Sequence, residues 1–535
     1  MPNAAISMNK SAVIFRIFLA ITLFSAAMCF PQQAWVSIFF FLIPLLQIIN
    51  TYPVLSNQRL LVIFFLFTAV SLFLSTLWFG SAFPLDWLKI YDPILSAIIL
   101  GSLWIGFILV LSLPLSLWGV LYASTHSLPL WYRPFFGAAL WVALEQIRSY
   151  LVALAVYGPE TLSGPHHTYY ALAYTLSHVP LVRELLPVGG LPLGTFVVIL
   201  LNIALFSLFQ IRSWKNPSVL VPLFLSIFLV VGSAITLTIL RTNDHEESIS
   251  VSIIGTALPS ATDRAEQDQK SRIGYDSASR IKKISDIIVL PENFNIPPIH
   301  EEIRHQFSGN PILVSSFSGK NYYNMYFLNL KNNAVAYTQK QLLMPLGEYR
   351  VSWIHSLLKL TNRSDWIALY EAPHQSATKS TGAHLYQHPY QNVIIGGTLC
   401  SENISPLLYR NLTGNGATLL INSTSLAPFH GSALLDRQIL AINTARALEN
   451  GRYLAVASNM GSSYVISDTG TLHSIMKPAT KNLSLLEDTV ETKQYLTPYV
   501  RFGDRVSPLS FIFVCITLLW KSSFSSKARN KRMLL

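Results

Sequence analysis

Three side chains in this sequence are of the kinds that together can attack a carbonyl carbon. Glu292 follows a short apolar run, Lys340 lies in a second apolar setting, and Cys400 follows a third run that ends at Leu399. Each has an ordinary explanation when it is considered alone, because glutamates and lysines are usually solvated and a buried cysteine is usually a small apolar filler. Together they supply a nucleophile, a base and a cation.

The chemistry of the three groups is complementary. A thiol attacks as its thiolate, and a lysine ammonium near Cys400 favours that form by lowering the thiol pKa. Glu292 can accept the thiol proton as general base and return it to the leaving group. Attack on an ester or amide carbonyl then gives an acyl-enzyme. Lys340 and the backbone N–H of Ser401 would stabilise the oxyanion, at about 3 kcal/mol per donor. The set predicts acyl transfer through a Cys400 thioester.

The elements that must position these residues lie in the second half of the chain. Strand-like runs cover residues 249–254, 286–290, 311–314, 392–399, 417–421 and 453–458, and helical patterns cover 263–284 and 433–450. This alternation predicts an α/β domain with α-β-β-α layers over residues 242–507. Glu292 and Cys400 each follow a predicted strand, where α/β folds often place reactive groups.

The first half of the chain has the composition of a membrane protein. The whole sequence is 51% hydrophobic and only 12% charged, whereas an ordinary soluble domain carries about 25% charged residues. A helical span needs about 20 apolar residues. Runs that qualify lie near 11–30, 33–50, 60–80, 93–123, 134–157, 193–211 and 218–240, and a shorter run covers 508–520. We therefore expect a membrane domain over 1–241 with about seven spans, and a last span with a basic tail over 508–535.

The distribution of basic residues predicts the orientation. With the N-terminus in the cytoplasm, the loops that hold Arg59, Arg133 and Lys215 fall on the cytoplasmic side, as does the basic tail that begins at Lys521. Seven crossings then place residues 242–507 outside the cytoplasm. The net charge of +11 is explained by this topology and by contact with anionic lipid. Nucleic-acid binding is not expected, because the globular part lacks a basic stripe with interleaved aromatic residues.

Short motifs around the three residues resemble a known superfamily. "LPEN" around Glu292, "YTQKQLLMPLGEY" around Lys340 and "TLCSEN" around Cys400 resemble the ordered Glu, Lys and Cys triad of the carbon-nitrogen hydrolase (nitrilase) superfamily. The pattern K-x-x-L-x-P-x-G-E-Y is similar to that of its membrane-bound branch, the apolipoprotein N-acyltransferases. The segment at 443–470 and the helix "LWVALEQIRSYL" at 140–151 resemble the same branch.

The resemblance implies a function and a location. An acyl chain would pass from a phospholipid to Cys400, and then to the α-amine of the diacylglyceryl-cysteine at the N-terminus of a lipoprotein. The enzyme would lie in the bacterial inner membrane with its nitrilase-like domain on the periplasmic side. Glu348 and Glu402 would be supporting carboxylates. The resemblance implies no metal ion and no organic cofactor.

Two positions depart from the family pattern. Ser401 stands where most members have an aromatic residue, and "SLAPFHG" at 425–431 replaces "NDAWFG", keeping Phe429 as a candidate substrate contact. Three alternatives therefore stay open. The protein could be a membrane-tethered nitrilase-like amidase, a paralogous acyltransferase with another acceptor, or a scaffold or transporter without catalysis.

Other candidate groups lie outside this set. Glu145 and Arg148 are three residues apart in a predicted membrane helix, so we expect them to pair in the bundle interior, where charged residues are functional candidates. The adjacent histidines His166 and His167 cannot readily face one metal ion from a regular element.

Overall fold

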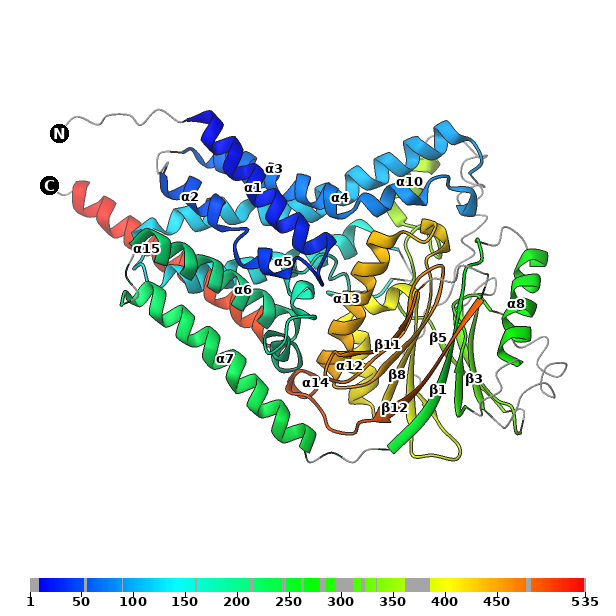
Figure 1. The fold of residues 1–535 in the computed structure, drawn as a ribbon. Helices are drawn as coiled ribbons and strands as arrows, with labels where there is room; N and C mark the ends of the chain where they lie inside the picture. Colours follow the sequence, from blue (N-terminus) through cyan, green and yellow to red (C-terminus); the bar gives the residue numbers. More distant parts are fainter. Residues whose placement is uncertain are drawn as a thin grey trace.

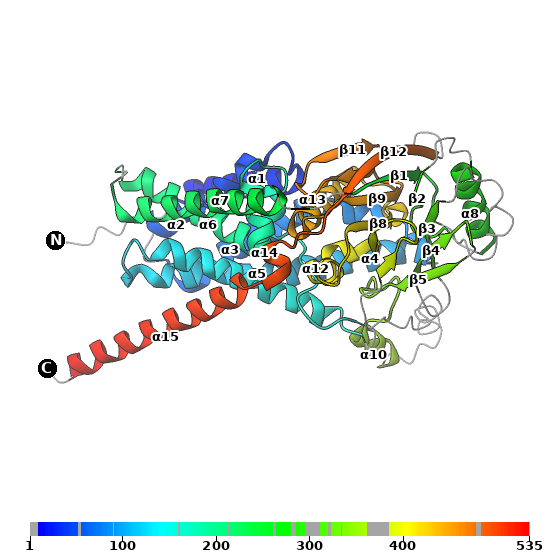
Figure 2. The same cartoon turned by 90° about the horizontal axis from the view of Figure 1, so that it is seen from below.

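The structure is a computed structural model of the whole chain. It describes residues 9–51, 55–88, 90–158, 161–211, 213, 215–242, 244, 247–260, 264–279, 285–294, 311–318, 323–332, 334–360, 385–477 and 483–533. A helical part and a sheet-containing part lie side by side, and both chain termini lie at the end of the helical part that is remote from the sheets (Figures 1 and 2).

Six helices in the described part of the chain are long and apolar enough to cross a membrane. They are α1 (Lys10–Cys29), α3 (Asn57–Ser75), α4 (Pro93–Ala123), α5 (Arg133–Ala155), α6 (Leu186–Ile211) and α7 (Pro217–Thr242). Apolar side chains are exposed along their outer faces, for example Ile98, Phe224 and Ile235, as is expected of helices that contact lipid. The prediction of a helical membrane protein is confirmed.

The predicted span at 33–50 differs from a regular helix. The segment forms a 3-10 helix, η1 (Trp35–Phe39), followed by the short helix α2 (Ile43–Thr51). Asn202 on α6 satisfies the backbone at the break, since its side chain accepts from the N–H of Leu42 and donates to the carbonyl of Ile38. Such partners are required where a helix is interrupted within a bilayer. Both views place α2 near the end of the helical part that carries the N-terminus (Figures 1 and 2).

The globular part contains two β-layers. Strands β1 (Glu247–Thr256), β2 (Ile287–Val289), β3 (Ile312–Ser318), β4 (Tyr323–Asn329), β5 (Val335–Gln339) and β12 (Leu483–Thr492) pair in the order β5-β4-β3-β2-β1-β12. Strands β6 (Leu385–Gln387), β7 (Ile394–Leu399), β8 (Leu419–Ser425), β9 (Leu454–Asn459), β10 (Ser463–Ile466) and β11 (Leu472–Met476) pair in sequence order. The two layers are joined by the single parallel pair Thr256 and Asn459.

A hydrophobic core fills the space between the two layers. It contains Ile253 and Val314 from the first layer and Ile395 and Ala455 from the second, all of them fully buried. Gly397 allows the layers to approach closely, because a Cβ at this position would lie 2.4 Å from the sulfur of Met325 on β4. This contact holds β7, and therefore the strand end that carries Cys400, against the opposite layer.

Helices cover both outer faces of this sandwich. Helix α8 (Arg264–Ser279) lies against the first layer, and α12 (Pro406–Gly414) and α13 (Ala433–Asn450) lie against the second (Figure 1). The prediction of a helical membrane domain with an α-β-β-α layered domain is confirmed. Helix α13 also packs against the membrane helices, so that Ile442 and Leu448 belong to the same hydrophobic cluster as residues of α3, α5 and α6.

Three further α-helices lie in the described part of the chain. Helix α10 (Ser352–Leu360) follows the Lys340 segment, and α14 (Pro498–Phe502) follows the last strand. The predicted span at 508–520 is part of a longer helix, α15 (Val506–Met533), which packs against α5. Its apolar stretch is short for a membrane span, as the sequence indicated.

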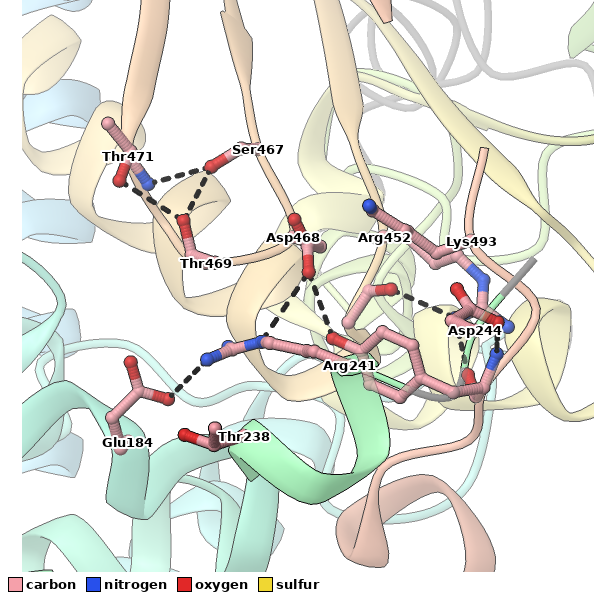
Figure 3. A network of polar contacts seen from close by, with 12 residues as sticks. Glu184, Thr238, Arg241, Asp244, Arg452, Ser467, Asp468, Thr469, Thr471 and Lys493 are labelled. Atoms are coloured by element: carbon pink, nitrogen blue, oxygen red, sulfur yellow. Dashed lines mark hydrogen bonds and ion pairs between the residues drawn. The ribbon is translucent and has the colours of Figure 1, made fainter. Parts of the chain in front are cut away.

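A network of polar contacts links the end of α7 to the globular part (Figure 3). Arg241 lies 3.2 Å from Glu184 in the membrane part and 3.5 Å from Asp468 in the turn between β10 and β11. Tyr495 donates a hydrogen bond to Asp468, and its backbone N–H donates to Asp244. The chain therefore leaves the membrane helices through a region with fixed polar contacts to both parts.

Candidate active site

Glu292, Lys340 and Cys400 follow the ends of three different strands. Glu292 lies three residues after β2, Lys340 directly follows β5, and Cys400 directly follows β7. β2 and β7 run parallel to their neighbours β3 and β8. The hydroxyl of Ser423 on β8 donates to the carbonyl of Leu290 and so holds the ends of β8 and β2 together. The structure thus brings the three predicted residues to one edge of the sandwich.

The Lys340 ammonium lies between two carboxylates. Its Nζ is 3.3 Å from Glu292 and 2.7 Å from Glu348, and its side chain is fully buried. Burial alone lowers the pKa of Lys340, but Glu292 and Glu348 outweigh burial and hold that pKa above its usual range. Glu348 is oriented in turn by the backbone N–H of Met344, which donates to its second oxygen at 2.8 Å. Lys340 is therefore a fixed cation at neutral pH.

Cys400 lies on a sharp turn between β7 and a 3-10 helix. Its φ of 46° is in the left-handed region, which is uncommon for a residue with a side chain. The thiol contacts Glu292, and the backbone N–H of Ser425 interacts with the sulfur. This turn directs the sulfur at the charged cluster instead of into the core between the layers.

The thiol is protonated in the resting structure. Burial and the neighbouring carboxylates raise the pKa of Cys400 to about 12, although Lys340 acts in the opposite direction. Lys340 does lower the pKa of Cys400, as expected, but burial and two anions outweigh this one cation. A base must remove the thiol proton during attack.

Glu292 has the position that such a base requires. It is 7% exposed, and it contacts both the thiol and the ammonium. Burial raises the pKa of Glu292, and Lys340 partly offsets that effect. A carboxylate with a raised pKa is a stronger base than an ordinary carboxylate.

Glu402 connects the Lys340 and Cys400 segments. One of its oxygens accepts from the backbone N–H groups of Gln341 and Leu342, and the other accepts from the N–H of Leu399. The side chain is 4% exposed. Glu402 therefore connects the backbone segments next to Lys340 and Cys400.

Ser401 and Phe429 line cavities next to Cys400. The Ser401 hydroxyl is buried without a hydrogen-bond partner among the described residues. The Phe429 ring packs edge-on against Trp78 of the membrane part, with ring centroids 5.1 Å apart. The neighbouring His430 contacts the carbonyl of Ser81. The altered 425–431 loop is thus a contact between the globular part and the membrane part.

Two cavities meet at the thiol. One, with an empty volume of about 890 Å³, runs between α13 and the membrane helices and is lined mainly by apolar and aromatic side chains, including Trp78, Tyr169, Ile439 and Ile442. The other, of about 1120 Å³, lies over the globular part, is more polar, and reaches Glu292, Glu348 and Lys270. Cys400 and Phe429 line both.

Sequence reasoning missed most of the lining of the apolar cavity. Met28, Trp78 and Tyr174 lie in three separate membrane segments, and nothing in their local sequence separates them from ordinary core residues. Met344 and Ser425 also line the cavities at the thiol. Their closeness to Lys340 and Phe429 in the sequence was the available signal.

The chain is similar to one protein family and to several known proteins. Residues 251–487 match the model of the carbon-nitrogen hydrolase family. A protein named apolipoprotein N-acyltransferase from Nostoc sp. is 23% identical over 487 residues, covering 84% of this chain and 89% of that protein. A protein of the same name from Thermosynechococcus vestitus is 22% identical, covering 83% and 84% respectively. An amidase from Nesterenkonia sp. is 16% identical with a TM-score of 0.32, covering 50% of this chain and 96% of the amidase.

The fold and the family match define a membrane protein that carries a carbon-nitrogen hydrolase domain. Over most of its length, the chain is a divergent relative of the apolipoprotein N-acyltransferases.

Proposed function

We propose that this protein is an apolipoprotein N-acyltransferase that carries the acyl chain on Cys400. The apolar cavity that joins the membrane helices to the thiol supports this proposal most directly. A phospholipid acyl chain needs an apolar path from the bilayer to the nucleophile, whereas a small soluble amide does not. The relatives that cover most of the chain have the same named activity.

The first half-reaction forms a thioester. The Cys400 sulfur attacks an ester carbonyl of the phospholipid while Glu292 accepts the thiol proton. Lys340 stabilises the negative charge that develops on the carbonyl oxygen. When the tetrahedral intermediate collapses, the C–O bond breaks and Glu292 returns the proton to the leaving oxygen. A lysophospholipid departs, and the acyl chain stays on sulfur.

The second half-reaction transfers the acyl chain to nitrogen. The α-amine of a diacylated lipoprotein attacks the thioester carbonyl, Lys340 again stabilises the oxyanion, and Glu292 accepts a proton from the amine. The C–S bond then breaks and the thiolate regains its proton. The more polar cavity offers room for this second substrate, since it also reaches Cys400.

The test is a search for the acyl-enzyme. Purified protein in detergent is incubated with radiolabelled phospholipid, and a hydroxylamine-sensitive adduct is sought before a diacylated lipopeptide is added. We expect an adduct that is absent in Cys400→Ala and strongly reduced in Glu292→Gln, and that passes to the peptide amine. Discharge to water with no peptide product would favour a membrane-tethered amidase. Absence of any adduct would favour a scaffold or transporter, or an acyl donor other than the phospholipids tried.

We further propose that the globular part lies on the periplasmic side of the bacterial inner membrane. The basic residues near the N-terminus and in the short loops support this orientation. In a variant without Cys29, Cys400 and Cys515, an impermeant thiol reagent applied to spheroplasts should label Lys477→Cys and not Arg59→Cys; both positions are exposed. The reverse labelling pattern would contradict the orientation.

A further inference from the structure

A third cavity lies between the membrane helices and the globular part. It has an empty volume of about 730 Å³ and shares no lining residue with the two cavities at Cys400. Its walls come from α5, α6, α12, α13 and α14 and from the start of α15. Its charged lining residues are Arg148 and Arg410 together with the carboxyl residues Glu145, Glu449 and Asp504, and Ser149 adds a hydroxyl.

The Arg148 guanidinium is buried here with unused hydrogen-bonding capacity. The residue is 2% exposed, and its Nη1 has no hydrogen-bond partner among the described residues. Its ion-pair partner, Glu145, lies 3.7 Å from Nη2. A buried guanidinium is stable only when its charge is compensated and its N–H groups are paired.

Glu145 cannot pair with all the N–H groups of Arg148, because both of its oxygens already accept other hydrogen bonds. One accepts from the backbone N–H of Leu172 at 3.1 Å and from the indole of Trp141 at 3.3 Å, and the other accepts from the hydroxyl of Thr195 at 3.0 Å. The carboxylate that neutralises Arg148 is therefore held by α6 and by the loop before it.

Other groups around the cavity also favour a ligand with acceptor oxygens. The hydroxyl of Ser149 is buried without a partner among the described residues. The second arginine, Arg410, also lines the cavity. Burial raises the pKa of Glu449 to about 7, so this carboxyl is partly neutral at physiological pH and opposes an anion less than an ordinary glutamate would.

We propose that this cavity binds the phosphate group of a membrane phospholipid, with Arg148 as its principal donor. Arginine pairs with phosphate through two parallel N–H···O bonds. Arg148 lies seven residues before the end of α5 at Ala155, which is about 10 Å along the helix on the side of the globular part. Lipid head groups lie near the ends of a membrane-spanning helix. The site is separate from the thiol and does not depend on the proposed reaction.

The test compares lipids that share chains but differ in phosphate. Binding of phosphatidylglycerol and of diacylglycerol with the same chains is titrated by native mass spectrometry of the full-length protein, and inorganic phosphate is tested by thermal unfolding. We expect phosphatidylglycerol to bind in preference to diacylglycerol. Arg148→Gln should weaken it about tenfold or more, since hydrogen bonds to charged groups are worth about 1.5–3 kcal/mol. The exposed Arg59→Gln is the matched control.

Two further variants test the proposal even if Arg148→Gln does not fold. Arg148→Lys retains the charge without the planar fork, so it should fold even where Arg148→Gln does not and should bind with intermediate affinity. Glu145→Gln removes the competing anion and should tighten phosphatidylglycerol binding. Inorganic phosphate could instead stabilise the protein, with the effect lost in Arg148→Gln and with the two lipids binding equally. That result would show that the cavity binds phosphate from solution and not the phosphate of a lipid. Equal binding of both lipids, unchanged in the Arg148 variants and with no effect of phosphate, would overturn the proposal.

Discussion

At the scale of single residues, the proposed reaction assigns the roles of base, cation and nucleophile to three different side chains. Cys400 keeps its proton at rest because its pKa is raised to about 12, and Lys340 stays charged between Glu292 and Glu348. The reactive pair is therefore a neutral thiol next to a carboxylate, and not a preformed thiolate. This distinction makes a prediction about pH.

The rate of thioester formation should follow the ionisation of Glu292. Because burial raises the pKa of this carboxyl above its ordinary value, kcat/KM should be low in acid, rise as Glu292 loses its proton, and level off at higher pH. The midpoint should lie above about 4.5, the range of an ordinary glutamate. Acylation by labelled phospholipid from pH 4.5 to 9 measures it. A rate that keeps rising tenfold per pH unit up to pH 9 would indicate thiolate attack without a base.

Glu402 should act through position and not through proton transfer. Glu402→Gln places an amide donor where the carboxylate accepts three backbone N–H groups, so at least one buried N–H loses its partner at a cost of about 1–3 kcal/mol. We expect a lower unfolding temperature and a tenfold or larger loss in acylation rate, with the midpoint of the pH profile unchanged. Glu487→Gln on the exposed face of β12 is the control. A shifted midpoint would show that Glu402 takes part in the proton path.

At the scale of elements, the sequence was most informative where a strand or helix has a single environment. The predicted helix at 433–450 coincides with α13, and the predicted strands at 249–254 and 453–458 fall on β1 and β9. These segments could be predicted because the spacing of their apolar residues indicates one type of secondary structure. Strands β4, β5 and β10 to β12 were not predicted. β5 and β11 carry a mixed, partly exposed pattern, and such edge strands depend on pairing that is not visible locally.

The candidate site, too, could be predicted from the sequence only in part. The types and order of Glu292, Lys340 and Cys400 could be predicted, because each lies in a distinctive local motif. The pairing of Glu402 with backbone N–H groups and the interruption of the second membrane segment could not. Both depend on residues distant in the chain, such as Leu342 and Asn202.

The contact between the 425–431 loop and the membrane part carries its own prediction. Phe429 lines both cavities and packs against Trp78, so Phe429→Ala opens the apolar cavity without touching the charged cluster. We expect the KM for the phospholipid donor to rise about tenfold while kcat changes less than about threefold, since contacts worth 1.4 kcal/mol change affinity tenfold. Kinetics with labelled phospholipid measure both. Phe502→Ala, at a ring that is 62% exposed, is the control. A fall in kcat at constant KM would instead place Phe429 among the residues that orient the thiol.

At the scale of the whole molecule, the site depends on how the two parts of the protein are held together. The apolar cavity has one wall from α13 and others from the membrane segments, so a small shift between the parts changes its width. Two kinds of contact oppose such a shift. One is the shared hydrophobic cluster that includes Ile442 and Leu448, and the other is the polar network at Arg241 (Figure 3).

The Arg241 network should therefore contribute to both stability and donor binding. Arg241 and Asp468 are 22% and 7% exposed in their side chains, and they lie on opposite sides of the junction. A double-mutant cycle with Arg241→Gln and Asp468→Asn should give a coupling energy of about 1–2 kcal/mol, because contacting charged groups that are largely removed from water couple by about 0.5–3 kcal/mol. Chemical unfolding of the purified protein measures this energy.

The control is the pair Lys493 and Glu491, which lies within the globular part. These side chains are 3.1 Å apart and the glutamate is 46% exposed, so the pair should couple by less than about 1 kcal/mol. If the Arg241 network also sets the width of the apolar cavity, Arg241→Gln should raise the KM for phospholipid. A substitution of Lys493 should leave that KM unchanged. Equal coupling in the two cycles, with no change in KM, would show that the hydrophobic cluster alone fixes the two parts.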